Sequence, residues 1–445
     1  MNKKNAIFIH SLFRTGSTYI WNTFRQSGVH HCYYEPFHQE LAFLETANLD
    51  RWSSGPDIAE TMGHPLLDRE YMHEYRHLLR PGEKGVPFFK KSFSFDDFCN
   101  NDSNPGQKKY LDFLLENAGG RIPVLQFNRS ALRLGWFKKY YPDVFHVYLL
   151  RDPRQQFHSF LAQQEKKNLD IFLLMNLLTA GVNMRKGTVF RDLARRLPLF
   201  EYHAADFGLE ERFYRILLPF YSLAEQYFIH GCIWFAALLE NLAHADMFLN
   251  MDLLSGDGGY RAEVSRRLAD ASGKTLDFSD ARITKTGMRF LPDAEAGRIE
   301  ADVQTMILKR IGREQLKKLS ERLASEGPAA DHFSQALWPE LQSRDLPAVD
   351  IKRALITKQK AIYEALSPQV MELKKEVKAL PTHSPMKELR NGREVSTSTR
   401  DRDALKIKLQ LMTALLEIPA GKSRGSRRLL RDAWSFLRKG GHGRA

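Results

Sequence analysis

The chain has 445 residues, of which 43% are hydrophobic and 11% aromatic, a composition typical of a folded globular protein with room for more than one domain. Its formal net charge of +13 favours anionic ligands or surfaces without choosing among them. The cysteines at 32, 99 and 232 are too few and too scattered for a disulfide framework, which indicates a reducing compartment.

The first predicted elements are a short buried strand over residues 6–9 and a helix that begins at the turn Arg-Thr-Gly-Ser-Thr of residues 14–18. Gly16 allows the backbone to come close to a ligand, and the first amides of the helix attract an anion together with its dipole. Side-chain donors suited to phosphate or sulfate come from Arg14, Thr15, Ser17 and Thr18. The turn is interpreted as an anion-binding loop, although an ordinary helix start with a solvated arginine also fits.

The second predicted strand lies within residues 29–37, an aromatic-rich run that Pro36 ends. Glu35 is then expected at the carboxyl end of a strand, on the same edge of the sheet as the loop that contains Arg14. The alternative role for this carboxylate is an ordinary surface ion pair.

Helices and strands continue to alternate as far as residue 150. Residues 38–80 are predicted to be mainly helical, residues 86–91 to form a strand, and residues 100–106 a loop. The next predicted elements are a helix over 107–119, a strand over 122–127, a helix over 129–141 and a strand over 144–150. This alternation predicts a parallel sheet with crossover helices.

The strand over 144–150 runs directly into Arg151–Asp152–Pro153, and Ser159 follows two turns into the next helix. Arg151 and Ser159 are expected to hold one anionic group from two sides. Together with the loop at Arg14, they predict two anion sites on one edge of the sheet, which suits a ligand with phosphate groups at both ends.

Residues 155–240 are predicted to be helical, followed by a strand over 247–251, a loop over 256–259 and mostly helices over 260–345. The apolar run of residues 171–178 is far shorter than the ~20 residues of a membrane span and predicts a buried helix. The apolar run behind Lys3 and Lys4 is too short for a signal peptide, which favours a cytoplasmic protein.

The C-terminal part divides into three predicted segments. Within residues 346–382, apolar residues from Ile362 to Leu380 recur at spacings of three and four, which predicts a coiled-coil-like helix interrupted at Pro368. Through residues 351–380 this helix is expected to pack on the main body, on a partner helix or on a second copy of the chain. Residues 383–402 read as a polar linker, and residues 405–416 fit either a strand or a helix.

The last 24 residues, 422–445, carry a net charge of +7 and an apolar face formed by Leu430, Trp434 and Leu437. Such a basic amphipathic helix suits an anionic membrane surface, so that the protein is expected in the cytoplasm and peripherally at the inner membrane. A solvated tail is the alternative. Nucleic acid is disfavoured because no groove-reading or stacking motif accompanies the charge. The predicted domains are therefore 1–345, 346–382 and 383–445.

The two anion-binding segments, each placed after a strand, resemble those of the sulfotransferases that use 3′-phosphoadenosine-5′-phosphosulfate (PAPS). In that family a basic, Ser/Thr/Gly-rich loop like residues 13–18 holds the 5′-phosphosulfate. A later Arg-(Asp/Asn)-Pro, with a serine eight residues after its arginine, binds the 3′-phosphate, and Arg151 and Ser159 match this pattern. The Glu-Pro at residues 35–36 is similar to that of carbohydrate sulfotransferases. In the tyrosyl-protein branch a glutamate at a similar distance is the general base.

The resemblance covers roughly residues 5–40 and 120–255 and implies an α/β, P-loop-like three-layer fold with a central, mainly parallel sheet and a helical C-terminal extension. It implies donor-binding roles for Arg14, Thr15, Gly16, Ser17, Thr18, Arg151 and Ser159. Glu35 is the implied base, with His38 and Glu40 as competitors, and Arg14 the implied stabiliser of the leaving phosphate. No metal is expected.

The implied reaction transfers a sulfuryl group from PAPS to a hydroxyl or amine of an acceptor, with a carbohydrate or glycolipid preferred because of the Glu-Pro. Arg129 and Arg133 are candidates for contact with an acidic acceptor or for the solvated surface of a helix. The Arg-Lys-Gly segment of cytosolic sulfotransferases has only a faint counterpart at residues 285–287. The residues that hold the adenine are therefore open.

Two other classes of function remain as alternatives. A P-loop nucleotide or small-molecule kinase shares the strand-loop-helix arrangement, but the Gly-Lys-(Ser/Thr) of its loop is absent from residues 13–18. A non-catalytic scaffold that associates with membrane through residues 422–445 would not require Arg14, Glu35, Arg151 and Ser159 together.

Overall fold

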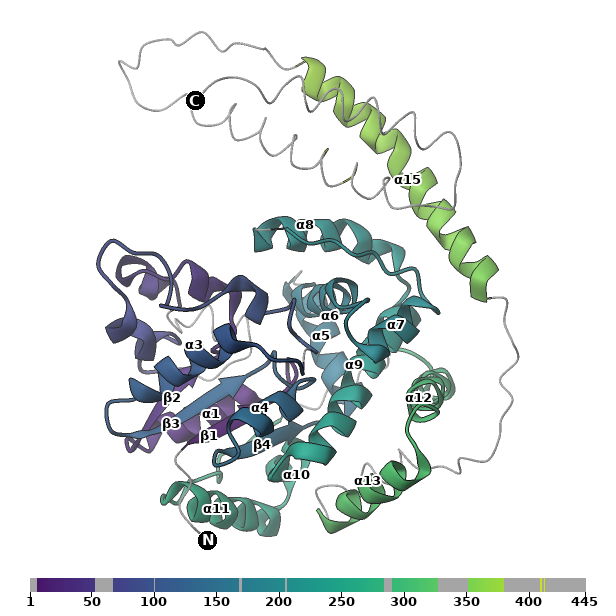
Figure 1. Ribbon diagram of the computed structural model, residues 1–445. Helices are drawn as coiled ribbons and strands as arrows, with labels where there is room; N and C mark the ends of the chain where they lie inside the picture. Colours follow the sequence, from purple (N-terminus) through teal and green to yellow (C-terminus); the bar gives the residue numbers. More distant parts are fainter. Residues whose placement is uncertain are drawn as a thin grey trace, which may run out of the picture. The chain divides into compact units, whose positions relative to one another are not determined.

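The computed structural model (Figure 1) describes residues 6–52, 67–99, 101–167, 170–204, 206–283, 290–326 and 351–379, together with Leu409 and Met412. The chain divides into two compact units, one formed by residues 1–193 and 222–344 and the other by residues 194–221 and 345–445. Among the described residues, no helix combines the length and the apolar character needed to cross a bilayer.

The first unit contains a five-stranded sheet in which all pairings are parallel, in the order β2-β3-β1-β4-β5. Its strands are β1 (Ile7–His10), β2 (His30–Tyr34), β3 (Ile122–Phe127), β4 (Phe145–Leu150) and β5 (Met247–Asn250). In the centre, Ile9 is in register with Gln126 of β3 and with Val147 of β4. The predicted α/β class with a parallel central sheet is confirmed.

Helices cover both faces of this sheet, as Figure 1 shows. Every strand residue except Ile122 is buried, which requires cover on both faces. Helix α1 (Ser17–Gln26) packs on β2 and β3, and α9 (Leu223–His244) packs on β4 and on α4 (Leu134–Tyr140). Phe137 of α4 meets Phe8 of β1 and Phe127 of β3 edge to face.

The strand order creates a switch point between β1 and β4. From β1 the chain passes by α1 to β2 on one side of the sheet, whereas from β4 it continues to β5 on the other side. The loops that leave these two neighbouring strands therefore diverge at their carboxyl ends, where open α/β sheets usually bind ligands. The loop with Arg14 and the segment with Arg151 both begin at this switch point.

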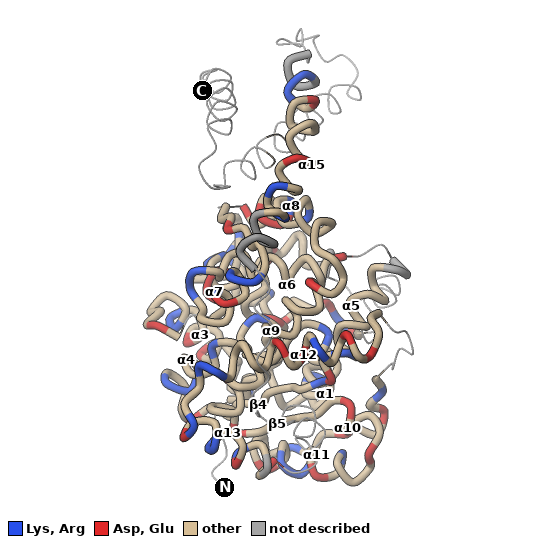
Figure 2. Tube along the Cα trace, turned by 90° about the vertical axis from the view of Figure 1, so that its right-hand side faces the viewer, with Lys and Arg blue, Asp and Glu red and all other residues tan. Residues whose placement is uncertain are grey.

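The remaining helices of the first unit surround the sheet. They are α3 (Pro105–Glu116), α5 (Pro153–Lys167), α6 (Ile171–Val182), α7 (Thr188–Ala194), α10 (Met251–Gly256), α11 (Gly258–Ser272), α12 (Asp293–Leu308) and α13 (Arg313–Ser325). The buried helix predicted at residues 171–178 is confirmed as part of α6. Neither β4 nor β5 contains a Lys, Arg, Asp or Glu, so both are tan in Figure 2, whereas α11 and α13 carry charges of both signs.

Two predictions for residues 38–91 were wrong. The described part of residues 38–80 contains only short 3₁₀ turns, η1 (Gln39–Ala42), η2 (Thr46–Trp52) and η3 (His73–Leu78). The strand expected over 86–91 is a turn followed by η4 (Lys91–Phe93). Positive φ angles of 83° at Gly85 and 65° at Phe88 bend the backbone away from an extended path.

The helix predicted over 129–141 begins only at Leu134. Residues 129–133 form a turn in which Arg133 donates to the carbonyls of Phe93 and Arg129, at 2.6 and 2.8 Å. Both arginines are buried, so their placement on a solvated helix surface was wrong. The buried cation of Arg133 stabilises this turn by satisfying backbone oxygens.

The second unit contains α8 (Phe207–Leu217), η5 (Leu218–Phe220) and α15 (Ile351–Ala379). Helix α15 continues through Pro368, so the predicted interruption there was wrong. Its predicted seam is buried at Ile362, Leu366, Val370 and Leu373. Leu409 and Met412 are helical and buried, whereas the predicted linker at 383–402 and the basic tail at 422–445 lie outside the described residues.

Candidate functional site

The loop between β1 and α1 has the backbone of a close-approach site. Gly16 has a φ of 100°, and a Cβ built there would lie 2.8 Å from Cε of Met251, so that both conformation and space favour glycine. Gly16 precedes α1 without a side-chain cap, so the first amides of the helix lack the usual hydroxyl or carboxylate partner. Uncapped helix N-termini are common binding sites for anions.

Arg14 joins this loop to the segment after β4. Its Nε donates to Oγ of Ser159 at 3.1 Å, and its guanidinium lies 5.2 Å from the ring centre of Phe172. A guanidinium nitrogen of Arg151 donates to the carbonyl of Arg14 at 2.9 Å. The residues predicted to form two separate anion sites are therefore brought together in one cluster, because their strands are neighbours in the sheet.

The Arg-Asp-Pro segment ends β4 and starts α5. The indole of Trp234 donates to the carbonyl of Arg151 at 3.0 Å, which fixes the end of the strand. The carboxylate of Asp152 accepts from the amide of Gln155 at 2.9 Å and caps α5, and Pro153 occupies the first helical turn, where a missing N–H costs nothing.

In this cluster the positively charged guanidinium groups of Arg14 and Arg151 lie close together. Burial and the neighbouring charge of Arg151 lower the pKa of Arg14 to about 10. Burial also lowers the pKa of Arg151, and Asp252 and Asp152 oppose this shift. An anion in contact with both guanidinium groups would reduce the repulsion between them. It would also offset the free-energy cost of removing them from water.

The hydroxyls of the loop mostly bond within the protein. Thr15 donates to the carbonyl of Leu12 at 2.7 Å, and Ser17 donates to Oδ1 of Asn128 at 2.9 Å. The hydroxyl of Thr18 lies 3.2 Å from that of Tyr34, and either can be the donor. In this structure the hydroxyls of Thr15 and Ser17 therefore stabilise the conformation of the loop.

Glu35 lies directly after β2, as predicted, and is buried. Its Oε1 accepts from Nδ2 of Asn128 at 2.6 Å, and its Oε2 pairs with the guanidinium of Arg129. Arg129 also donates to Oε1 of Gln39 at 2.8 Å and stacks near the ring of Phe13. The alternative of a surface ion pair for Glu35 was wrong, since both charged side chains are buried.

The competing bases lie close by in η1. The Nδ1 of His38 accepts from the amide of Glu40 at 3.3 Å, and burial together with the charge of Arg129 holds the pKa of His38 well below its ordinary value. Glu40 occupies the first turn of η1. His38 therefore acts locally as a cap, whereas Glu35 presents its carboxylate to the ends of β3 and β1.

Backbone strain is concentrated at the predicted site. Among the described residues, three non-glycine residues have a positive φ: Arg14 (62°), Glu35 (41°) and Phe88 (65°). Two of these three are residues singled out from the sequence for chemistry. Strained backbone of this kind persists where the surrounding structure holds it, and it clusters at binding and catalytic sites.

Asn128 and the role of Arg129 were missed in the sequence. Both follow β3 directly, so the rule that located Glu35 and Arg151, a polar residue just after a parallel strand, also applied to them. Without the strand order, however, nothing indicated that the end of β3 lies between those of β2 and β1.

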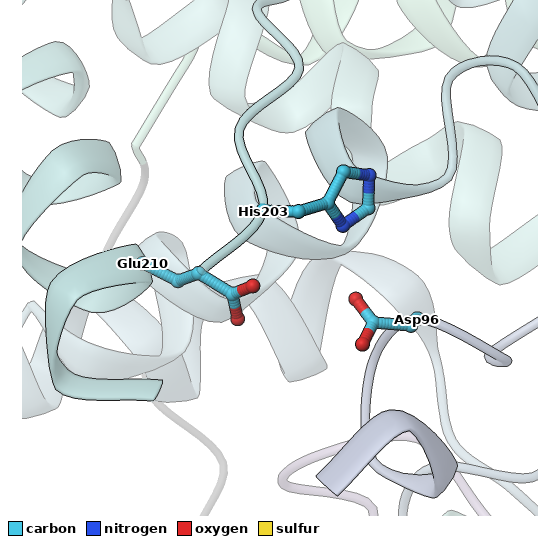
Figure 3. A group of neighbouring side chains, drawn as sticks. All are labelled: Asp96, His203 and Glu210. Atoms are coloured by element: carbon cyan, nitrogen blue, oxygen red, sulfur yellow. The ribbon is translucent and has the colours of Figure 1, made fainter. Parts of the chain in front are cut away.

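Figure 3 draws three further titratable side chains, Asp96, His203 and Glu210. Asp96 belongs to the first unit and the other two to the second. Within the second unit, Oε1 of Glu210 on α8 accepts from the amide of Ala204 at 2.8 Å, and Nε2 of His203 lies 3.4 Å from a carboxylate oxygen of Glu201. These contacts stabilise the chain before α8.

Comparisons of the chain with models of protein families, with curated proteins and with solved structures found no match.

Proposed function

We propose that the chain is a PAPS-dependent sulfotransferase. The observation that carries this proposal is the joining of Arg14, Ser159 and Arg151 at the switch point between β1 and β4. The guanidinium groups of buried Arg151 and half-buried Arg14 and an uncapped helix N-terminus are the proposed site for a polyanion, and these residues stand in the order and spacing of the sulfotransferase signatures.

The residues present fit the donor. Gly16 allows the loop to turn at a φ of 100° at the start of α1, where Met251 packs against its Cα. In the proposed complex, Arg14 and the amides of residues 15–18 hold the 5′-phosphosulfate, and Arg151 and Ser159 hold the 3′-phosphate. PAPS supplies an activated sulfuryl group whose leaving group is a phosphate. The positive charge of Arg14 would stabilise the negative charge that develops on this phosphate as the sulfuryl group leaves it.

Glu35 is the proposed general base that takes the proton of the acceptor hydroxyl. Its support is its place at the edge of the sheet that holds Arg14 and its link to the donor loop, since Asn128 bonds both Glu35 and Ser17. Buried side chains on both sides fix the carboxylate, which favours proton transfer in a defined direction.

The proposed fold type is P-loop-like, with a central first strand followed by a glycine-containing loop and a helix. A kinase of this fold type is the alternative. It is less well supported because residues 13–18 contain an arginine but no lysine, and the hydroxyl of Ser17 is engaged by Asn128.

For the acceptor we propose a carbohydrate or glycolipid, on the basis of the Glu-Pro at residues 35–36. We also propose that residues 422–445 attach the protein to an anionic membrane surface, which suits a lipid-linked acceptor, and that residues 351–380 meet a partner helix. Removal of residues 422–445 is expected to release the protein from anionic vesicles, and undiminished attachment would reject the membrane proposal.

The experiment for the function is transfer of label from [³⁵S]PAPS to a panel of saccharides, glycolipids, peptides and phenols. The proposal expects labelled product from at least one saccharide or glycolipid, without added divalent metal. Label transfer that Arg151→Ala leaves unchanged would reject the site, and phosphate transfer from ATP with Mg²⁺ in the matched assay would favour the kinase.

A further inference from the structure

Asn128 connects the loop at the start of α1 with the carboxylate of Glu35. Its Oδ1 accepts from Oγ of Ser17 and from Nε2 of Gln126, both at 2.9 Å, and Oγ of Ser11 lies 2.6 Å from the same oxygen. On the other side its Nδ2 donates to Oε1 of Glu35 at 2.6 Å. Asn128 is only 6% exposed, so water does not compete freely for these bonds.

The oxygen and the nitrogen of this amide have separate partners. An asparagine side chain has one acceptor oxygen and one donor nitrogen, and here Ser17 and Gln126 both donate to the oxygen. The nitrogen donates to Glu35. The opposite orientation would place an oxygen 2.6 Å from Oε1 and would require a proton on Glu35.

The two oxygens of Glu35 therefore face donors on the protein. Nδ2 of Asn128 meets Oε1, and the guanidinium of Arg129 meets Oε2. Both oxygens of the carboxyl group thus act as hydrogen-bond acceptors, which fixes the orientation of the group. The other titratable groups near this pair are Tyr34 on β2, Tyr75 on η3, and His38 and Glu40 at η1.

We propose that Asn128 is a positioning residue, whose amide nitrogen holds the carboxylate of Glu35 and whose oxygen ties it to the donor loop through Ser17. The base role of Glu35 rests on the proposed function, whereas its orientation rests on the contacts alone. In the proposed reaction, Asn128 would fix the carboxylate relative to the loop that holds the donor, so that the proton acceptor and the sulfuryl group keep one relative position.

The direct test is a pH titration of full-length protein by infrared spectroscopy, with glutamate carboxyl carbons labelled with ¹³C and Glu35→Gln used to identify the signal of Glu35. The informative variant is Asn128→Asp, which keeps the shape of the side chain but places a second carboxylate against Oε1. Asn48→Asp is the matched control, because Asn48 accepts from the amide of Glu45 and does not contact Glu35.

In Asn128→Asp, two adjacent carboxylates should share one proton, which moves proton uptake at this site upward by more than about one pH unit. Asn48→Asp should titrate like the wild type. A protonated signal at neutral pH in the wild type that Glu35→Gln removes would overturn the proposal, because the amide would then face the other way. Unchanged proton uptake in Asn128→Asp would overturn it as well.

A kinetic measurement separates positioning from folding. Asn128→Ala should lower single-turnover transfer from PAPS by about 100-fold, as expected for a misplaced base, while the affinity for the product nucleotide stays within about threefold. A parallel loss of rate and nucleotide affinity would contradict a positioning role. If the wild type does not bind the nucleotide, the proposed function fails, but the infrared titration still decides the orientation of Asn128.

Discussion

Nε of Arg14 donates to Oγ of Ser159 at 3.1 Å, although the two residues are 145 positions apart in the chain. One residue belongs to the loop after β1 and the other to the helix after β4. Their contact exists because these strands are neighbours in the sheet, while their connections run to opposite sides. The two halves of the proposed donor site are therefore assembled by the strand order.

Replacement of Arg14 should weaken binding of 3′-phosphoadenosine-5′-phosphate, the desulfated product of PAPS. Because a buried, charge-assisted hydrogen bond is lost, Arg14→Ala should lower the affinity by about 10- to 100-fold. Arg266→Ala removes the same charge from a side chain that is 67% exposed on α11 and should leave the affinity unchanged. Calorimetry with the three proteins checks this, and equal affinities for wild type and Arg14→Ala would remove Arg14 from the site.

Gly16→Ala should destabilise the protein more than Gly28→Ala at the other end of α1. A side chain at φ 72° costs about 1–2 kcal/mol, and Gly28 has open space around a new Cβ. At Gly16 the φ of 100° is less favourable still, and Met251 must move. Urea unfolding of both variants measures the difference. Equal losses in the free energy of unfolding for the two variants would show that the loop before α1 does not require the backbone conformation of glycine at residue 16.

His230→Phe should make stability less dependent on pH. Burial lowers the pKa of His230 to about 3, and its ring lies among Phe157, Phe160 and Tyr227, where phenylalanine fits. Between about pH 6.5 and pH 3, His230 binds a proton in the unfolded state but stays neutral in the folded state. This histidine therefore costs the wild type up to about 1.4 kcal/mol per pH unit as the pH falls towards 3.

The measurement is urea unfolding of the wild type and His230→Phe at several pH values. At about pH 8 the histidine is neutral in both states, so any difference there reflects packing and the lost hydrogen bonds of the imidazole, including that with Asn176. The difference in free energy of unfolding should then move in favour of the variant as the solution is acidified. Parallel pH profiles would contradict a buried, neutral His230.

Glu35→Gln should abolish transfer but keep the nucleotide site. Loss of a general base lowers the rate by about 10²- to 10⁴-fold, while product-nucleotide affinity should stay within about threefold, since Glu35 pairs with Asn128 and Arg129 after β3. Glu40→Gln and His38→Gln are the matched tests of the competing bases and should retain most of the rate. Full activity of Glu35→Gln, or inactivity of Glu40→Gln, would reassign the base.

Strong local patterns made the sheet predictable. Residues 122–127 and 144–150 are apolar runs with clear ends, and β3 and β4 occupy almost the same positions. The position of Glu35 at the end of β2 followed from Pro36, which stops the strand. In these segments local propensity and tertiary structure agree.

The failures have tertiary causes. Residues 86–91 have the composition of a strand, but the segment turns back so that the amides of Gly85 and Val86 donate to the carbonyls of Leu44 and Leu41. Helix α4 begins at Leu134, later than predicted, because the guanidinium of the preceding Arg133 donates to the carbonyl of Phe93 in another segment. The contacts of Asn128 with Ser17 and Glu35 could be predicted only from the order of the strands in the sheet. The periodicity of apolar residues in the sequence does not reveal this order.

The most direct test of the account is calorimetry of the wild-type protein with 3′-phosphoadenosine-5′-phosphate, in parallel with ATP and Mg²⁺. The account predicts that the bisphosphate nucleotide binds without metal, that binding stabilises the protein by about 2.7 kcal/mol at 100 times its Kd, and that Arg151→Ala abolishes both effects. No binding of this nucleotide at high micromolar concentration, or tighter binding of ATP with Mg²⁺, would contradict the account.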